Sequence, residues 1–278
     1  MRHSCVVAVL QLALAGTVCA AAGMPPHLSP DGQSEYRAFL EAPGHRAFAV
    51  APGGAFGWVA GEADAGSAED KALAACQSQG AQRCVAYAID GRTVFDARAW
   101  PRLWGPYATS AQAVRAATGT ELGRRFPDLA FADAHGNPTS IASLRGKVAL
   151  VHFWGAWCPP CRREMPDLQR LQAALASRRD IVFVPLQSRE RFEVSRAWAS
   201  RQGIGLPLFD SGATGEDDAK LRLVGGNAIA DREIAARFPT TYVLDKHGLV
   251  VFSHVGPVTD WLQYEPFLRD AAERSGGR

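Results

Sequence analysis

Two cysteines separated by two prolines are the residues of this sequence best suited to chemistry. Cys158 and Cys161 stand in the run "HFWGAWCPPCRREM", where a strand-like stretch gives way to a helix-like one. A thiol at the start of a helix faces unpaired N–H groups and the positive end of the helix dipole, which lowers its pKa and favours the reactive thiolate. The spacing predicts that Cys158 attacks a substrate disulfide and that Cys161, one turn further on, resolves the mixed disulfide.

The residues around the pair favour this redox interpretation over two others. Pro159 and Pro160 add no N–H where helix donors lack partners anyway, and they stiffen the turn, while Trp157 is expected to shape its exposed side. A zinc site would need a second Cys or His pair at ligand spacing, and the histidines after residue 124 are scattered. A purely structural disulfide would not need an exposed turn. We therefore expect no metal and no cofactor.

Composition and charge define the class of protein. The chain has 278 residues, is 47% hydrophobic and 21% charged, and carries a formal net charge of +2. These values are typical of a soluble globular protein with two domains, and they give no electrostatic reason to expect nucleic-acid binding. Most of the positive charge is arginine, which we interpret as a composition bias.

The N-terminus predicts export. Arg2 and His3 precede an apolar run, and small residues follow it, so residues 1–20 are typical of a signal peptide cleaved before Ala21. The run is short for a bilayer span, which needs about 20 residues, so an uncleaved anchor is disfavoured. Cys19 suggests lipidation, but the bulky Val18 before it argues against this alternative.

A small α+β unit is expected next, over residues 37–97, after a polar linker at 25–36. Its pattern predicts the order ββαββ, with Ser67 as the N-cap of the helix and Gly80 at the helix end. Removal of the signal peptide leaves four cysteines in an oxidising compartment, so Cys76 and Cys84 are predicted to form a structural disulfide that stabilises a small core. We see no catalytic constellation here, and we interpret the unit as a docking or stability module.

Residues 98–123 are expected to form a linker, and residues 124–278 a second domain in which strands and helices alternate. Such alternation, ending in a β-hairpin and a last helix, predicts an α/β fold with a mixed sheet. The elements expected between the helix of the cysteine motif and the C-terminus are a strand at 181–187, a helix at 189–202, a short extended segment at 206–210, a helix at 217–225, strands at 240–245 and 249–256, and a helix at 260–273.

From about residue 124 to 275 the chain resembles thioredoxin-fold proteins, and among them the exported TlpA/ResA-type thiol-disulfide oxidoreductases. The residues that carry the resemblance are "FPDLAFADAHGNPTSIASLRGKVALVHFWGAWCPPCRREMPDL" and "RFPTTYVLDKHGLVVFSHVG". The resemblance implies that Pro239 is a cis-proline whose loop faces the cysteine pair. It also implies that Phe238, Pro239 and Thr240 bind an extended substrate. Phe238 departs from the small or β-branched residue usual at this position.

Two titratable residues near the motif carry open interpretations. His152 lies six residues before Cys158, where thioredoxins resemble one another in placing a buried Asp that exchanges protons with the second thiol. His152 is either a proton acceptor near neutral pH or a core-edge histidine bonded to backbone. Glu164 matches an acid found in TlpA/ResA-like proteins, and is either a modulator of the Cys161 thiol or an exposed acid of the first helical turn.

The function expected from these residues is that of a periplasmic thiol-disulfide oxidoreductase that reduces protein disulfides. The resemblance implies protein substrates that bear disulfides, a membrane thiol donor of electrons, and a role in cytochrome c maturation or a related process. The alternatives are a disulfide oxidase or isomerase, a copper-handling chaperone that uses both thiols as soft ligands, and an N-terminal module that does the binding itself. The oligomeric state does not follow from the sequence.

Overall fold

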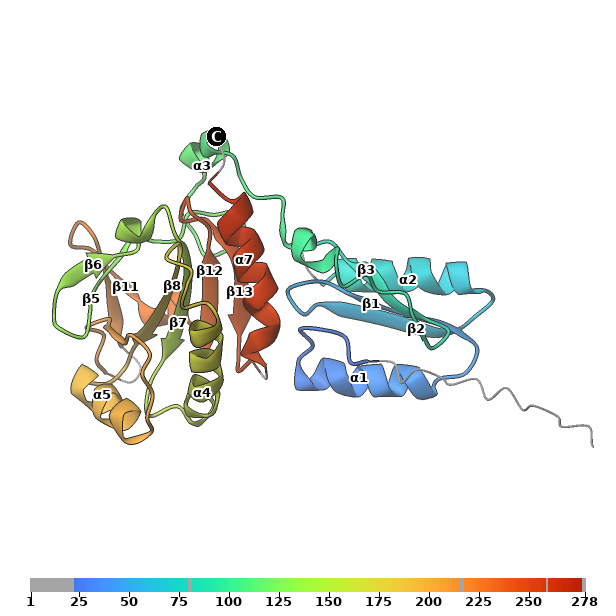
Figure 1. Ribbon diagram of the computed structural model, residues 1–278, viewed down its shortest axis with the longest axis horizontal. Coiled ribbons are helices and arrows are strands. Elements are labelled where there is room, and N and C mark those ends of the chain that lie inside the picture. The colour runs from blue at the N-terminus through green and yellow to red at the C-terminus, as the bar shows by residue number, and fades with distance from the viewer. Residues whose placement is uncertain (1–22, 80–81, 216–217, 259, 277–278) are drawn as a thin grey trace, which may run out of the picture.

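Two lobes built on separate sheets make up the chain in the computed structural model, which describes residues 23–79, 82–215, 218–258 and 260–276 (Figure 1). The predicted signal peptide, residues 1–20, lies outside the described residues. Within these described ranges, no helix has the length and apolar character needed to cross a bilayer.

The smaller lobe is an antiparallel sheet in the order β2-β1-β3-β4 with one helix on each face (Figure 1). Its elements are α1 (Pro30–Glu41), β1 (His45–Val50), β2 (Phe56–Glu62), α2 (Ala65–Gln77), β3 (Val85–Ile89) and β4 (Arg92–Thr93). Successive side chains of β1 point to opposite faces of the sheet and contribute to two separate clusters. Phe48 and Val50 pack in one cluster with Tyr36 of α1, whereas Ala47 and Ala49 pack in another with α2.

Helix α1 corrects the expected linker at 25–36 and the order ββαββ, because the unit has a further helix in front. The helix begins at Pro30, and the Ser29 side chain caps it by accepting a hydrogen bond from the Gly32 N–H. Tyr36 and Phe39, three residues apart, are its buried aromatic residues. With so few apolar residues, the helix is not recognisable from its sequence pattern. It nevertheless covers one face of the sheet, which would otherwise be exposed.

Helix α2 begins three residues earlier than expected. Its N-cap is Asp64, which accepts a hydrogen bond of 2.8 Å from the Ser67 N–H, so the prediction of Ser67 as the N-cap is wrong. Asp and Ser cap helices about equally well, and the sequence places both here. Gly80, the expected helix end, lies outside the described residues. The structure joins Cys76, on α2, to Cys84, just before β3, in a disulfide.

The larger lobe holds a mixed sheet in the order β11-β10-β5-β9-β8-β7-β12-β13, with β6 paired to β5. Strands β7, β8 and β9 run parallel, and β12 lies antiparallel beside β7. The strands are β5 (Leu129–Ala132), β6 (Pro138–Ser140), β7 (Val148–Trp154), β8 (Ile181–Gln187), β9 (Phe209–Asp210), β10 (Lys220–Leu223), β11 (Ala228–Ala230), β12 (Thr240–Leu244) and β13 (Val250–Val255).

Helices lie on both faces of this sheet. They are η2 (Ala142–Leu144), α4 (Pro159–Ala174), α5 (Phe192–Arg201), α6 (Asp231–Ile234), η3 (Trp261–Tyr264) and α7 (Glu265–Arg274). Helices α4, α5 and α7 pack on one face, whereas Leu144 of η2 and Ile234 of α6 pack on the other. Buried side chains of α4, α5 and α7 form one core with Leu150 of β7, while Val151 and Phe153 belong to the core on the opposite face. Side chains along a strand alternate between its two faces, so His152 points to the same face as Leu150, which α4 covers.

One expected helix of this lobe is a strand. The segment 217–225 was predicted to be helical, but Lys220–Leu223 forms β10 between β5 and β11. Lys220 and Arg222 are exposed and Leu221 is buried, which is the period of two that a half-buried strand requires.

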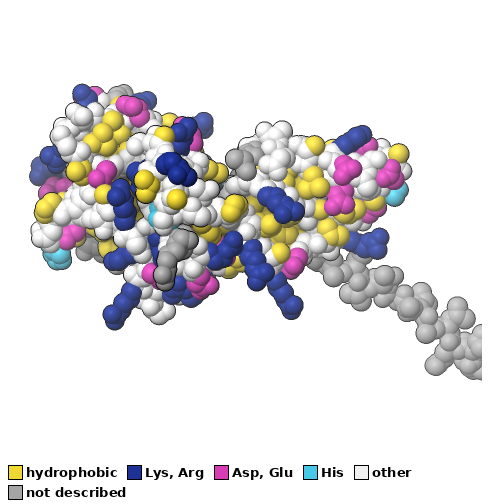
Figure 2. Space-filling model, turned by 90° about the horizontal axis from the view of Figure 1, so that it is seen from above, with side chains coloured by type: hydrophobic (Ala, Val, Ile, Leu, Met, Phe, Trp, Pro, Cys, Tyr) yellow, Lys and Arg dark blue, Asp and Glu magenta, His cyan; other side chains and the backbone are white. Residues whose placement is uncertain are grey.

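The segment expected as a linker, 98–123, packs against both lobes and contains η1 (Trp100–Trp104) and α3 (Ser110–Arg115). Trp104 belongs to the larger core, with its ring centroid 3.7 Å from that of Phe267 on α7. The His27 ring lies against Trp100, Trp104 and Tyr264, so aromatic side chains pack between the lobes. Figure 2 shows the narrower waist at which the two lobes meet.

Candidate active site

The cysteine pair lies where β7 ends and α4 begins. Cys158 is the N-cap of α4 and forms a disulfide with Cys161, with the two Cα atoms 5.3 Å apart. The Cys161 N–H lies 3.3 Å from the Cys158 sulfur. Pro159 occupies the first position of the helix, as expected for a residue that cannot donate there. The helix N-terminus therefore presents its positive end to Cys158.

The turn is exposed although the sulfur atoms are not. Trp157 is 43% exposed, whereas Cys158 is 2% exposed and Cys161 is fully buried. The Trp157 ring is held by a hydrogen bond of 2.9 Å from its Nε1 to the Ser188 carbonyl, just after β8. A substrate therefore meets Trp157 at the surface of the turn before it reaches the Cys158 sulfur.

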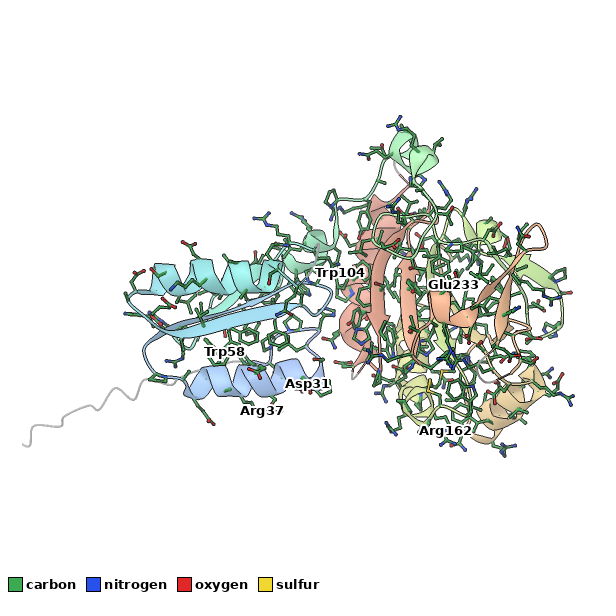
Figure 3. All side chains as sticks on the ribbon, turned by 180° about the vertical axis from the view of Figure 1, so that it is seen from behind. Asp31, Arg37, Trp58, Trp104, Arg162 and Glu233 are labelled. Atoms are coloured by element: carbon green, nitrogen blue, oxygen red, sulfur yellow. A yellow bond between two sulfur atoms is a disulfide. The ribbon has the colours of Figure 1, made fainter. Side chains whose placement is uncertain are left out.

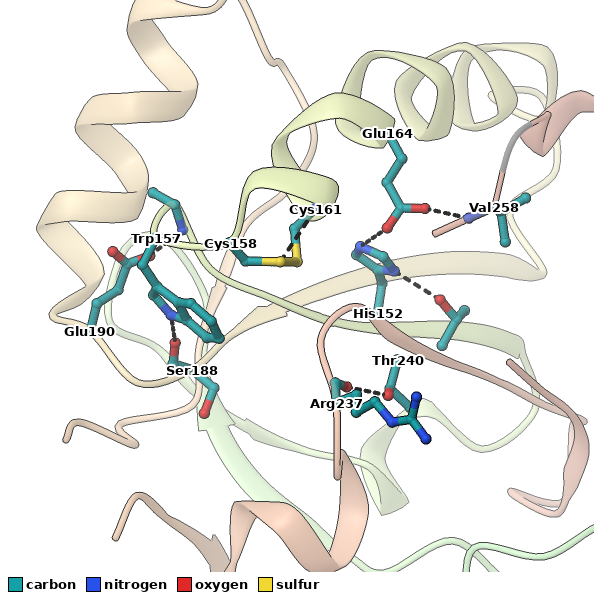
Figure 4. The surroundings of a disulfide bond; sticks show 12 residues. His152, Trp157, Cys158, Cys161, Glu164, Ser188, Glu190, Arg237, Thr240 and Val258 are labelled. Carbon is teal, nitrogen blue, oxygen red and sulfur yellow. Dashed lines mark hydrogen bonds and ion pairs between the residues drawn. A yellow bond between two sulfur atoms is a disulfide. The ribbon is translucent and has the colours of Figure 1, made fainter. Parts of the chain in front are cut away.

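The cis-proline loop lies beside the cysteine turn because of strand register. The Phe238–Pro239 peptide bond is cis, as predicted. Thr240, the first residue of β12, pairs with Phe153 near the end of β7, and the two strands are antiparallel, so the residues before Thr240 meet those after Trp154. The Thr240 hydroxyl donates a hydrogen bond of 2.6 Å to the Arg237 carbonyl, which secures the loop (Figure 4).

Phe238 and Trp157 meet across these two loops, with ring centroids 5.1 Å apart. The Arg189 guanidinium lies over both rings, 4.8 Å from the centroid of Phe238 and 5.8 Å from that of Trp157. Two hydrogen bonds, of 2.6 and 3.1 Å, hold Arg189 to the buried carboxylate of Asp231. The three segments around the disulfide are thus tied together through one arginine.

The sequence did not single out Arg189 or Asp231. They lie 42 positions apart and carry no motif. The one local signal is the backbone of Arg189, whose φ of 69° is in the left-handed region that few non-glycine residues adopt. The sequence alone does not show that conformation.

His152 is fully buried on the central strand β7, so the interpretation as a core-edge histidine bonded to backbone is wrong. Its Nδ1 lies 2.9 Å from the hydroxyl of Thr241, its register partner on β12. Burial lowers the pKa of His152 to about 3. The imidazole is therefore neutral across the physiological range.

Glu164 is also buried, with 4% of the residue exposed, so the interpretation as an exposed acid is wrong. Its Oε2 accepts a hydrogen bond of 2.9 Å from the Val258 N–H, and its Oε1 lies 3.4 Å from the His152 Nε2 (Figure 4). Burial raises the pKa of the Glu164 carboxyl to about 8, although the Val258 N–H acts in the opposite direction. Neither Oε1 nor Nε2 forms a hydrogen bond with another group, and the two atoms face each other in the core.

Helical spacing places this acid close to the second thiol. Glu164 follows Cys161 by three residues on α4, and positions three apart lie on the same face of a helix. Figure 4 shows the facing side chains of Glu164 and His152 on the Cys161 side of the disulfide. Among the residues that the structure describes, no group of three or more His, Cys, Asp or Glu side chains is arranged to hold a metal ion.

Comparisons with known proteins agree with this geometry. The Redoxin family model matches residues 121–265. The thioredoxin-like protein YneN of Bacillus subtilis is 31% identical over 56% of this chain and 82% of its own length. The thiol-disulfide oxidoreductase ResA of Halalkalibacterium halodurans is 25% identical over 51% of this chain and 73% of its own. The thiol:disulfide interchange protein DsbE of Pseudomonas aeruginosa is 30% identical over 49% and 68%.

The Redoxin match covers most of the larger lobe, including the cysteine turn, the cis-proline loop and the strands that bring them together. The smaller lobe precedes the Redoxin match and is a separate sheet. The chain belongs to the redoxin family, and it is a thioredoxin-like thiol-disulfide oxidoreductase of the ResA type.

Proposed function

We propose that this protein is an exported reductase of protein disulfides that acts through the Cys158–Cys161 pair. The observation that carries the proposal is the disulfide at the N-terminus of α4, beside the cis-Pro239 loop. An N-terminal helix position stabilises the Cys158 thiolate, and the buried Cys161 is within disulfide reach of it.

The proposed cycle transfers two electrons from the dithiol to the substrate. The Cys158 thiolate attacks one sulfur of the substrate disulfide, that bond breaks, and the first substrate thiolate leaves and takes a proton from water. Cys161 then loses its proton and attacks the Cys158 sulfur. The mixed disulfide breaks, the second substrate thiol leaves, and the Cys158–Cys161 disulfide remains.

Deprotonation of Cys161 is the difficult step, because the thiol is fully buried. In our proposal the ionised form of Glu164 accepts this proton. Its Oε1 faces the Nε2 atom of His152 at 3.4 Å. A carboxyl whose pKa is raised to about 8 exchanges protons near neutral pH, and the imidazole beside it, whose pKa is lowered to about 3, stays neutral and positions the carboxyl.

Trp157, Phe238, Pro239 and Thr240 form the proposed substrate site. Trp157 and Phe238 offer ring surfaces beside the cysteine turn, and the loop of Pro239 provides an extended backbone for a substrate segment to align with. Thr240 is 1% exposed and its hydroxyl is bonded to the Arg237 carbonyl, so we assign it a supporting role in that loop.

Location and partners are further parts of the proposal. The signal-like residues 1–20 and the similarity to ResA and DsbE support a periplasmic protein whose disulfide is reduced again by a thiol donor in the membrane. The same relatives support a role in cytochrome c maturation. The smaller lobe lacks a described metal cluster, and we propose that it docks partners or stabilises the protein.

Single-cysteine variants test the proposal. Reduced Cys161→Ser should accumulate a mixed disulfide with insulin, visible by non-reducing electrophoresis, because the first attack proceeds and resolution does not. Cys158→Ser should form no such adduct and should lose insulin reduction. If Cys158→Ser retained the activity of the unmodified protein, the assignment of the nucleophile would be wrong.

A further inference from the structure

Three arginines border the cysteine turn and the cis-proline loop without any ion pair. Arg162 and Arg163 directly follow Cys161, and Arg237 directly precedes Phe238. All three are exposed, and none has an ion-pair partner in the described part of the chain. Strand register brings their two segments together at the same edge of the sheet. Arg162 is labelled in Figure 3 and Arg237 in Figure 4.

The carboxylates near this edge do not cancel that charge. Asp231 is buried and paired with Arg189. Glu190 accepts hydrogen bonds from the Ala156 N–H and the Ser195 hydroxyl, and its carboxylate offsets at most one of the three arginines. Glu164 is buried with a raised pKa.

The remaining exposed acids of the neighbouring helices have basic neighbours. Glu193 lies 3.4 Å from Arg191, and Glu233 accepts a hydrogen bond from the Ala230 N–H and follows Arg232 in the sequence. Free positive charge is therefore concentrated here, although the whole chain carries only +2.

The centre of this surface is aromatic. Trp157 and Phe238 meet beside the disulfide, and Asp231 neutralises the guanidinium that lies over them. A substrate segment would therefore place its cysteine and apolar side chains against the rings, while residues on either side reach the arginines. Guanidinium groups bind carboxylates through paired hydrogen bonds, which is the interaction that acidic flanking residues provide.

We propose that Arg162, Arg163 and Arg237 form a basic collar that selects substrates with Asp or Glu close to the target cysteine. The proposal rests on the proposed function, because it describes which disulfides the Cys158–Cys161 pair reduces. The proposal also assigns a role to three of the arginines, whose abundance in the sequence we interpreted as a composition bias. The collar acts mainly on association, because complementary charge raises the rate of encounter and that effect falls with salt.

The test compares three disulfide probes in the reduced protein. They are a peptide with Glu on both sides of each cysteine, the same peptide with Gln in place of Glu, and the uncharged bis(2-hydroxyethyl) disulfide. We expect kcat/KM for the Glu peptide to exceed that for the Gln peptide by about tenfold at low salt, and the ratio to approach one at high ionic strength.

The variant R162Q/R163Q/R237Q should remove the preference and leave reduction of the uncharged probe unchanged. The matched control R37Q/R98Q/R115Q removes the same charge from exposed arginines remote from the disulfide, and it should keep the preference. Equal rates of the unmodified protein on the two peptides, or a preference that survives in the first variant, would overturn the collar. No reduction of any probe would instead refute the proposed function.

Discussion

Burial sets the chemistry of single residues in this site more than sequence position does. Glu164 and His152 occupy positions that the sequence marked as ambiguous, and both are removed from water. A carboxyl that loses its water shell holds its proton more tightly, and an imidazole in the same surroundings gives its proton up more readily. At neutral pH the two groups therefore face each other mainly in their neutral forms, on the Cys161 side of the disulfide.

The Glu164→Gln variant tests the proton-transfer role at this scale. The substitution keeps the acceptor for the Val258 N–H but removes the carboxyl that titrates at about 8. We expect resolution of the mixed disulfide to slow at least about tenfold, since general acid–base groups contribute this much or more. We also expect its pH dependence between pH 6 and 9 to flatten. Stopped-flow fluorescence of the reduced protein mixed with a disulfide peptide measures both.

Asp167→Asn is the matched control for this variant. Asp167 lies one turn further along α4, is also buried, and accepts a hydrogen bond of 2.9 Å from the Trp261 N–H in the same segment that Glu164 contacts. It should keep the pH dependence of resolution but displace it to lower pH, because the charge of Asp167 helps to raise the pKa of the Glu164 carboxyl. A profile that stays the same in Glu164→Gln would remove this residue from the mechanism.

Among the elements, the loop after β8 connects the cysteine turn to the cis-proline loop. Ser188 and Glu190 bind backbone groups or side chains of the cysteine turn, and Arg189 between them binds Asp231 at the start of α6. The loop therefore fixes the relative position of Trp157 and Phe238. This arrangement predicts that the Arg189–Asp231 pair matters for both stability and the shape of the site.

The Asp231→Asn variant should lower the free energy of unfolding by about 3 kcal/mol, because it leaves the largely buried guanidinium of Arg189 without its charge partner. Tryptophan fluorescence of the folded variant should also change, since Arg189 lies over the Trp157 ring. Urea denaturation gives the stability. Glu193→Gln, in the exposed pair with Arg191, is the control and should cost less than about 1 kcal/mol. Equal costs for the two variants would contradict the role of the buried pair.

The elements also show what the sequence could and could not predict. The strand-turn-helix of the cysteine motif, the strands β8, β12 and β13, and the cis-proline were predictable, because each depends on a local pattern or a specific motif. The helical prediction over β10 failed although the alternation of Lys220–Leu223 was readable.

The contacts that complete the site were not predictable from one sequence, because they join distant positions. His152 and Thr241 are 89 residues apart, and Glu164 and Val258 are 94 apart. Only the register of β7 with β12, and the return of the chain over α4, bring these partners together. Local sequence patterns do not indicate which distant residues come into contact.

On the scale of the whole molecule, an aromatic waist couples the smaller lobe to the larger. His27 is 5% exposed there, neither of its ring nitrogens has a hydrogen-bond partner, and its backbone N–H donates to Gln263 at 2.6 Å. Burial lowers the pKa of His27 to about 3, with His254 a smaller cause in the same direction. The waist therefore tolerates only a neutral imidazole.

This burial predicts acid sensitivity at the waist. The pKa of His27 is about 3 in the folded state and near 6.5 in the unfolded state. The contribution of His27 to stability is therefore complete above pH 6.5 and is lost as pH falls from 6.5 towards 3, at about 1.4 kcal/mol per pH unit. Below pH 3, His27 is protonated in both states, and the loss of stability does not increase further.

Urea denaturation from pH 7 to pH 4 measures this slope. His27→Asn, which tolerates the positive φ of this position, should show a shallower fall than the unmodified protein. The exposed His45, replaced in His45→Asn, provides the comparison and should keep the original slope. A slope that is unchanged in His27→Asn would show that the waist does not carry the acid sensitivity.

The reduction potential of the Cys158–Cys161 pair tests the central claim most directly. Equilibration with glutathione buffers, followed by alkylation and mass spectrometry, reads this pair separately from Cys76–Cys84 in the same sample. A protein that reduces disulfides should show a value of about −200 mV or lower for Cys158–Cys161, with Cys76–Cys84 lower still, as expected for a structural disulfide. A value near −120 mV for Cys158–Cys161, typical of a strong oxidant, would contradict the assignment as a reductase.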